Sequence, residues 1–216
     1  GTPDASGALC DAQMKPAPDY RPPLKLVSLD IETTAQGDLY SIALEGCGER
    51  QVYMLGPPNK TDAVDFKLDY CDTRAQLLEC LNQWLATHDP DAIIGWNVVQ
   101  FDLLVLEKLC QRLNIPLQLG RANQAIHWRH EDANDGGRSF VVIPGRVALD
   151  GIELLKAANY RYESYSLQNI AEELLGESKL ISGNHRGDDI TRLFNTDKRA
   201  LAEYNLHDCE LVWKIF

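Results

Sequence analysis

The feature that most constrains this chain is a largely apolar segment, residues 24–31, that contains one acid, Asp30, near its end and is followed directly by a second, Glu32. Side chains along a β-strand alternate between its two faces, so these two acids share one face. Strands disfavour aspartate, and an unpaired charge that faces a core is costly. Either the strand has ended and both acids are solvated at its rim, or a functional site requires them there.

Two further acids are candidates to join this pair. Asp102 lies at the start of a predicted helix, residues 101–113, where the helix dipole alone favours an acid. Asn97, shortly before it, is compatible with a simple cap or turn. Asp208 lies within an apolar helical stripe, and Tyr204, four residues earlier, shares that face. A buried salt bridge or hydrogen bond explains Asp208, and a metal site explains it at least as well.

Four carboxylates that converge on one small volume repel one another unless cations neutralise them. Ligands that offer only oxygen favour a hard divalent ion such as Mg²⁺ or Mn²⁺. Two such ions, roughly 3.5–4 Å apart, form the clamp that cleaves phosphodiesters. Asp30, Glu32, Asp102 and Asp208 therefore predict two divalent metal ions, Mg²⁺ or Mn²⁺, and metal-dependent nuclease chemistry.

Other polar residues fit structural roles better. Asp150 follows a short predicted strand and suits the N-cap of a helix that begins at the next residue. His127 and His130 flank a tryptophan beside a predicted hairpin, where a loop position is favoured over metal binding. The six cysteines form no Cys-x-x-Cys pair, which indicates reduced thiols in a cytoplasmic protein.

Composition narrows the class of protein. A length of 216 residues suits one domain with at most a modest appendage. No apolar run approaches the roughly 18 residues that a membrane span needs, and no signal peptide opens the chain. The formal net charge of -11 argues against a broad basic groove for duplex DNA. A site for a few single-stranded nucleotides needs little basic surface, so the charge does not exclude a nuclease.

The chain divides into two parts. Residues 1–23 are rich in proline and lack apolar periodicity, which predicts a flexible leader or linker. Residues 24–216 form the predicted domain, with a β-hairpin insertion near residues 126–142. Three early strands followed by alternating helices and strands predict an α/β layered fold with a mixed central sheet flanked by helices. Strands are expected at residues 24–31, 39–45, 51–55, 92–95 and 146–149, and helices at residues 74–86, 101–113, 151–159, 166–175 and 197–216.

Three segments together resemble the motifs of a known family. Residues 27–34 (Val-Ser-Leu-Asp-Ile-Glu-Thr-Thr), 93–103 (Ile-Ile-Gly-Trp-Asn-Val-Val-Gln-Phe-Asp-Leu) and 204–212 (Tyr-Asn-Leu-His-Asp-Cys-Glu-Leu-Val) match, in order and spacing, the 3′–5′ proofreading exonuclease domain of B-family DNA polymerases. That domain belongs to the superfamily named for the acids Asp-Glu-Asp-Asp, and its fold is ribonuclease-H-like. The resemblance covers nearly everything from about residue 20 onward, including the segment 165–179 between the second and third motifs.

The resemblance implies a role for each matched residue. Asp30 would bridge both metals, Glu32 and Asp208 would complete the site of the nucleophile-side ion, and Asp102 would hold the second ion partly through water. Tyr204 would orient the attacking water, which places the chain in the tyrosine subclass. Thr33, Asn97 and Phe101 match positions that hold the last nucleotides of DNA.

The resemblance also implies the substrate and partners. The substrate would be a single-stranded or mismatched DNA 3′ end, released as nucleoside monophosphates. The polymerase and N-terminal domains of the same full-length chain would be partners, because the chain begins at Gly1 and ends within a helical stretch, as an excised piece does. The piece itself is expected to be monomeric.

Two alternatives remain. One is a free-standing exoribonuclease or oligonuclease of the same superfamily, which acts on RNA. The other is a catalytically idle scaffold that only binds single strands or contacts a polymerase. The intact set of acids argues against the second alternative.

Overall fold

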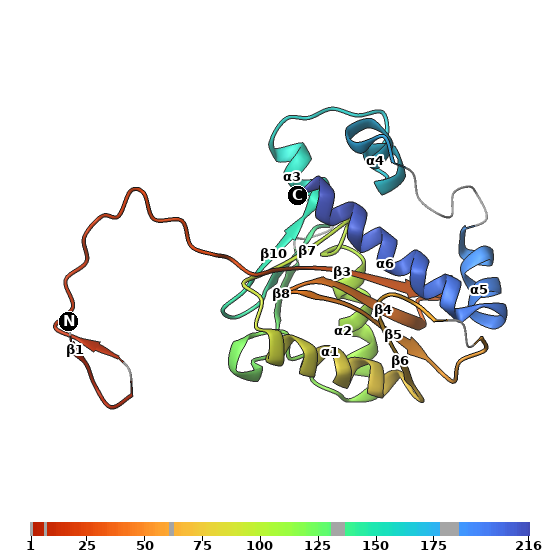
Figure 1. Cartoon of the computed structure of the whole chain (residues 1–216), viewed down its shortest axis with the longest axis horizontal. Helices are drawn as coiled ribbons and strands as arrows, with labels where there is room; N and C mark the ends of the chain where they lie inside the picture. The colour runs from red at the N-terminus through yellow and green to blue at the C-terminus, as the bar shows by residue number, and fades with distance from the viewer. Residues whose placement is uncertain (1, 7, 61–62, 131–136, 178–185) are drawn as a thin grey trace.

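The computed structural model describes residues 2–6, 8–60, 63–130, 137–177 and 186–216. Its centre is a mixed six-stranded sheet with the strand order β10-β7-β3-β4-β5-β6 (Figure 1). The pairs β3–β4 and β4–β5 are antiparallel, whereas β3–β7, β7–β10 and β5–β6 are parallel. The strands are β3 (Leu26–Thr33), β4 (Leu39–Gly46), β5 (Glu49–Leu55), β6 (Lys67–Cys71), β7 (Ala92–Gly95) and β10 (Val147–Asp150).

Helices cover both faces of this sheet (Figure 1). Helices α1 (Arg74–His88) and α2 (Asp102–Leu113) contribute their buried leucines to the cluster on one face. The long helix α6 (Lys198–Ile215) crosses the other face and packs on β3, β4 and β5. This arrangement confirms the predicted layered α/β fold with a mixed central sheet and flanking helices.

Strand β3 is buried on both faces, and its successive side chains point to opposite faces of the sheet. Val27, Leu29 and Ile31 point into the cluster built with α1 and α2. Burial of each such side chain stabilises the fold by roughly 1.5–3 kcal/mol, so the strand is firmly anchored. The alternate positions, which include Asp30 and Glu32, therefore face α6.

The strand also continues beyond its expected end. It pairs with β4 through Glu32 opposite Ser41, and a register shift follows between Glu32 and Thr33. The interpretation that the strand has ended and both acids are solvated at its rim is therefore wrong. Both acids belong to a hydrogen-bonded central strand, and Glu32 is only 2% exposed.

Three shorter helices follow the sheet along the chain: α3 (Gly151–Ala157), α4 (Leu167–Leu175) and α5 (Arg186–Thr196). The Asp150 side chain accepts a hydrogen bond from the Ile152 amide, which confirms its predicted role as the N-cap of α3. Helix α5 and the edge strand β6 were not predicted from the sequence.

The predicted hairpin is present as a separate two-stranded sheet. Strands β8 (His127–His130) and β9 (Ser139–Val142) pair antiparallel, with His127 opposite Val142 and His130 opposite Ser139. Residues 131–136 of the predicted hairpin, between these two strands in the sequence, lie outside the described residues. A short 3₁₀ turn, η1 (Arg121–Asn123), precedes the hairpin.

The described part of the first 23 residues contains two dipeptide strands, β1 (Thr2–Pro3) and β2 (Leu9–Cys10), which pair with each other and are exposed. The domain boundary near residue 23 and the flexibility of the leader remain predictions. Every cysteine is a free thiol, as expected. Among the described residues, no helix is both long enough and apolar enough to cross a bilayer.

Candidate active site

Three of the predicted acids meet between the sheet and α6. Asp30 and Glu32 come from β3 and Asp208 comes from α6, and one oxygen from each carboxylate lies within 4.8 Å of the other two. Glu32 and Asp208 are buried, whereas Asp30 is partly exposed. The two-residue alternation of the strand and the face of the helix therefore bring together the three acids that the sequence places far apart.

Asp102 lies beside this cluster but is turned toward the backbone. Its carboxylate accepts a hydrogen bond of 3.1 Å from the Ile31 amide. Burial raises the pKa of Asp102 well above its usual range, and the neighbouring Asp30 and Glu32 carboxylates raise it further. The fourth acid therefore lies near Asp30 and Glu32, in an environment that opposes its negative charge.

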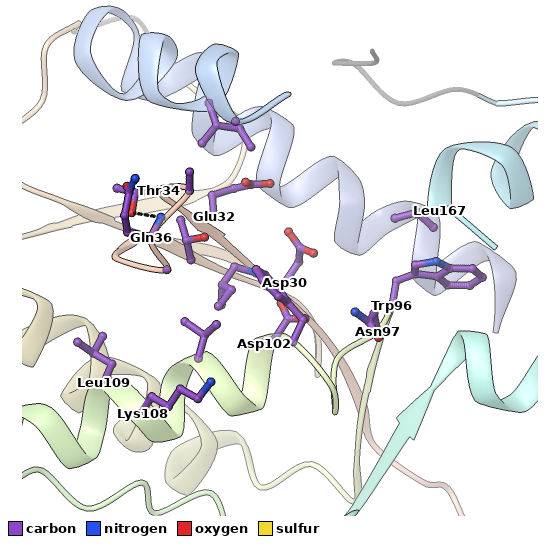
Figure 2. A pocket seen from close by; sticks show the side chains of 18 of the residues that line it. Asp30, Glu32, Thr34, Gln36, Trp96, Asn97, Asp102, Lys108, Leu109 and Leu167 are labelled. Atoms are coloured by element: carbon purple, nitrogen blue, oxygen red, sulfur yellow. Dashed lines mark hydrogen bonds between the residues drawn. The ribbon is translucent and has the colours of Figure 1, made fainter. Parts of the chain in front are cut away.

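Asp30, Glu32 and Asp102 line a cleft of about 910 Å³, and Figure 2 shows them close together. The predicted DNA-binding residues Thr33, Asn97 and Phe101 also line this cleft. Phe101 is 42% exposed, so its ring is available to stack on a base. The structure thus brings all three predicted DNA-binding residues to the space beside the acids.

The turn that carries Asn97 and Phe101 has a specific backbone requirement. Gly95 ends β7 where a β-carbon would come within 2.5 Å of the Val98 β-carbon and 3.0 Å of the Leu29 carbonyl oxygen. Asn97 then adopts a left-handed conformation with φ of 60°, which asparagine tolerates well. The tight turn places the N-terminus of α2, and with it Asp102, against β3.

Two side chains fasten this turn to the rest of the domain. Asp150 accepts a hydrogen bond from the Val99 amide at 3.3 Å in addition to capping α3. The Gln100 side-chain amide donates to the Ser139 carbonyl at 2.6 Å and accepts from the Ser139 amide at 3.2 Å. Burial raises the pKa of Asp150, while the backbone amides of the turn and of α3 lower it in part.

Tyr204 lies deeper than the cleft. It is 1% exposed and belongs to a cluster that α6 forms with β4 and β5, together with Tyr40, Ala43 and Met54. It lies one helical turn before Asp208, as predicted, but it is not among the described residues that line the cleft. Its role in orienting water therefore remains a prediction.

Several residues of the site were not singled out from the sequence. Asn205, on α6, donates a 2.7 Å hydrogen bond from its side-chain amide to Asp30 and accepts another of 2.7 Å from Ser41. Its spacing of three residues from Asp208 places both on one helix face, which is the signal that the sequence offered. Trp96 and Lys108 also line the cleft, at opposite ends in Figure 2.

The donor set suits hard divalent ions. Asp30, Glu32 and Asp208 offer only carboxylate oxygens, and their closeness is unfavourable unless positive charge balances it. Among the described residues, this is the group of acids, histidines or cysteines that is close enough to hold a metal ion.

Comparison with known proteins gives the family. Residues 8–170 match the family described as "DNA polymerase family B, exonuclease domain". The chain is 55% identical to DNA polymerase II of Escherichia coli (strain K12) over 213 residues, which are 98% of this chain and 27% of that protein. It is 26% identical to a DNA polymerase of Thermococcus litoralis over 203 residues, which are 89% of this chain and 11% of that protein.

A eukaryotic relative gives the same result. The chain is 28% identical to the DNA polymerase delta catalytic subunit of Oryza sativa subsp. japonica over 224 aligned positions, which cover 88% of this chain and 19% of that subunit. The chain thus spans about a quarter of the bacterial relative and less of the others. These matches confirm the family inferred from the three motifs and the ribonuclease-H-like type of its fold. The chain belongs to the exonuclease domain family of B-family DNA polymerases.

Proposed function

We propose that this domain hydrolyses the terminal phosphodiester of single-stranded or mismatched DNA from the 3′ end and releases nucleoside monophosphates. The observation that carries the proposal is the convergence of Asp30, Glu32 and Asp208 within 4.8 Å beside a cleft, in a member of an exonuclease family. The activity would proofread for a DNA polymerase, with this domain as one part of a longer chain.

Each acid has a distinct proposed task. Asp30 would contact both of two divalent ions, Mg²⁺ or Mn²⁺, while Glu32 and Asp208 would hold the ion on the nucleophile side. Asp102 would approach the second ion partly through water, once its carboxylate is released from the Ile31 amide. When bound, such ions increase the acidity of the attacking water and offset charge on the phosphate.

The remaining residues would handle the DNA and the water. Phe101 would stack on a terminal base, a contact worth about 1–3 kcal/mol, and Asn97 and the Thr33 backbone would hold the last nucleotides. Tyr204 would orient the attacking water from its position one turn before Asp208, which defines the tyrosine subclass. A paired terminus must first be melted, at about 1–2 kcal/mol per base-pair step, so mismatched ends would be favoured.

The same proposal extends to the setting of the domain. Its partners would be the DNA 3′ end and the polymerase and N-terminal domains of a longer chain, since the relatives are polymerases of which this chain spans 27% or less. The isolated domain would be a monomer. The location would be cytoplasmic, where a bacterial polymerase works.

A polarity assay tests the proposal. A single-stranded DNA oligonucleotide labelled at its 5′ end should shorten by one nucleotide at a time in Mn²⁺, and an RNA of the same sequence should be cut more slowly. Asp30→Ala should abolish cleavage, whereas Glu79→Ala, which removes an exposed acid from α1, should leave the rate unchanged. Faster cleavage of RNA would favour the exoribonuclease alternative. An Asp30→Ala variant that retains more than about a tenth of the rate would contradict the assigned chemistry, because a required group contributes about 10²–10⁴-fold.

A further inference from the structure

A buried hydrogen-bond relay reaches the acid cluster from behind. Asn205 is 0% exposed, and its side-chain nitrogen donates to Asp30 over 2.7 Å. Its side-chain oxygen accepts from the hydroxyl of Ser41, also over 2.7 Å, and Ser41 is likewise 0% exposed. The relay Ser41–Asn205–Asp30 therefore joins three elements, namely β4, α6 and β3.

The chemistry of the partners gives this relay one direction. An ionised carboxylate only accepts hydrogen bonds, so the Asn205 group that faces Asp30 must be its NH₂. The carbonyl of Asn205 then faces Ser41, and the Ser41 hydroxyl must donate. Asp30 therefore fixes the amide orientation, and the Ser41 hydroxyl satisfies the Asn205 carbonyl in that orientation.

Its position makes this asparagine unusual for a purely structural residue. Asparagine is a poor helix former, and buried leucines such as Leu201, Leu206 and Leu211 surround this position along α6. A buried amide is tolerated only when its polar atoms are paired. An apolar residue would serve packing alone at this position, so the amide points to a role at Asp30.

The relay acts where the acids repel one another. The Asp30 carboxylate lies within 4.8 Å of two further carboxylates and would lower their repulsion by rotating away. A hydrogen bond from Asn205 opposes that rotation. The same bond ties the strand that carries Asp30 and Glu32 to the helix that carries Asp208, because Asn205 and Asp208 share α6.

We propose that Asn205 is a positioning residue for the metal ligands: it holds the Asp30 carboxylate in the orientation that binds divalent ions, and Ser41 acts through Asn205. This inference rests on the proposed function, because it concerns the same metal site. Partners of this kind, hydrogen-bonded to a metal ligand, typically change metal affinity by about 10–100-fold.

Metal binding without substrate provides the test. Titration calorimetry with Mn²⁺ should show that Asn205→Leu weakens binding by about 10–100-fold and that Ser41→Ala weakens it less. The double variant should bind Mn²⁺ as Asn205→Leu does, because Asn205→Leu already removes the hydrogen bond that joins Ser41 to Asn205. A purely structural role would lower the thermal stability of these variants without this loss of Mn²⁺ affinity.

Asn82→Leu is the matched control. Asn82, on α1, also uses both ends of its amide, donating to the Pro116 carbonyl at 3.0 Å and accepting from the Gln118 amide at 2.9 Å, far from the acids. It should lose thermal stability but keep its Mn²⁺ affinity. Ser41→Ala removes a single oxygen, so it still tests the relay if Asn205→Leu fails to fold.

The outcomes separate this inference from the proposed function. Unchanged Mn²⁺ affinity in Asn205→Leu and Ser41→Ala, or additive losses in the double variant, would overturn the relay while leaving the metal site intact. A wild-type protein that binds no Mn²⁺ would overturn the proposed function and the relay together.

Discussion

Replacing Asp208 by asparagine should stabilise the metal-free protein, although Asp208 is buried within the domain. Asp208 is 0% exposed and lies within 4.8 Å of both Asp30 and Glu32. Asparagine has nearly the same shape, so packing of α6 against the sheet should be retained. The main change is the removal of one of three crowded charges.

The magnitude follows from the geometry. Two unit charges 4.8 Å apart repel by about 3.5 kcal/mol at an effective dielectric constant of about 20, and Asp208 takes part in two such pairs. The repulsion that can be relieved is limited to about 4 kcal/mol, because protonating an ordinary aspartate at pH 7 costs about that much. Burying the new amide group costs about 1–3 kcal/mol, which is subtracted from this gain. A net gain of about 1–3 kcal/mol corresponds to a melting temperature higher by roughly 2–12 °C for a domain of this size.

Thermal melting with and without Mn²⁺ tests this reasoning. Wild type should gain about 2.7 kcal/mol when Mn²⁺ is at 100 times its dissociation constant, and Asp208→Asn should gain much less. The order of stability should therefore reverse when the metal is added. Glu79→Gln, a charge change at an exposed position on α1, should alter neither melting curve. A metal-free Asp208→Asn protein that melts below wild type, with an equal Mn²⁺ response in both, would refute the account of carboxylate repulsion.

Three further predictions address the groups around the acids. Tyr204→Phe should slow DNA hydrolysis by roughly 10- to 1,000-fold with unchanged Mn²⁺ affinity, measured by single-turnover kinetics and calorimetry, because only a hydroxyl that positions water is lost. Lys108→Gln should reduce the slope of the log binding constant for single-stranded DNA against log salt by about 0.7, the value for one lost phosphate contact. Arg112→Gln should change this slope less, because the Arg112 guanidinium already pairs with the Asp38 carboxylate at 2.7 Å. Since burial raises the pKa of Asp150 above 3.8, the folded state binds the extra proton, and stability should fall as pH rises through the raised pKa. Urea unfolding between pH 4 and 7 should show that the free energy of unfolding falls less in Asp150→Asn than in wild type.

The spacing of apolar residues along the sequence predicted most of the strands and helices. The alternation in residues 24–31 and the helical spacing in residues 74–86 and 197–216 each identified the correct element. Strand β6 was missed although exposed Lys67 and Asp69 alternate with less exposed Leu68 and Tyr70, because the strand is only five residues long and a run that short is a weak signal. Helix α5 was missed because its exposed face is strongly polar.

The acids of the site were predictable for the same reason, whereas their supports were not. Asp30 and Glu32 share a strand face, and Asp208 interrupts an apolar helical stripe, so each is unusual within its own element. The spacing of Asn205 from Asp208 gave only a weak signal, and its contacts are with Asp30 and Ser41, which lie 175 and 164 residues away in the sequence. Its contacts depend on how α6 is placed over the sheet, and no local pattern encodes that placement.

The orientation of Asp102 was likewise beyond local patterns. The sequence places it at the start of α2, but its hydrogen bond to the Ile31 amide depends on the tight turn after β7. Gly95 allows that turn because a larger residue would meet Val98 and Leu29. The exact approach of α2 to β3 therefore decides whether the fourth acid faces the cleft or the backbone.

The central claim is most directly tested by a crystal structure of the domain with Mn²⁺ and a single-stranded DNA trinucleotide, using anomalous scattering to locate the metal. We predict two Mn²⁺ peaks at Asp30, Glu32 and Asp208, one of them also near Asp102, with the 3′-terminal phosphodiester beside them. Absence of Mn²⁺ from these acids, or a DNA strand bound with its 5′ end at the acids, would contradict the account.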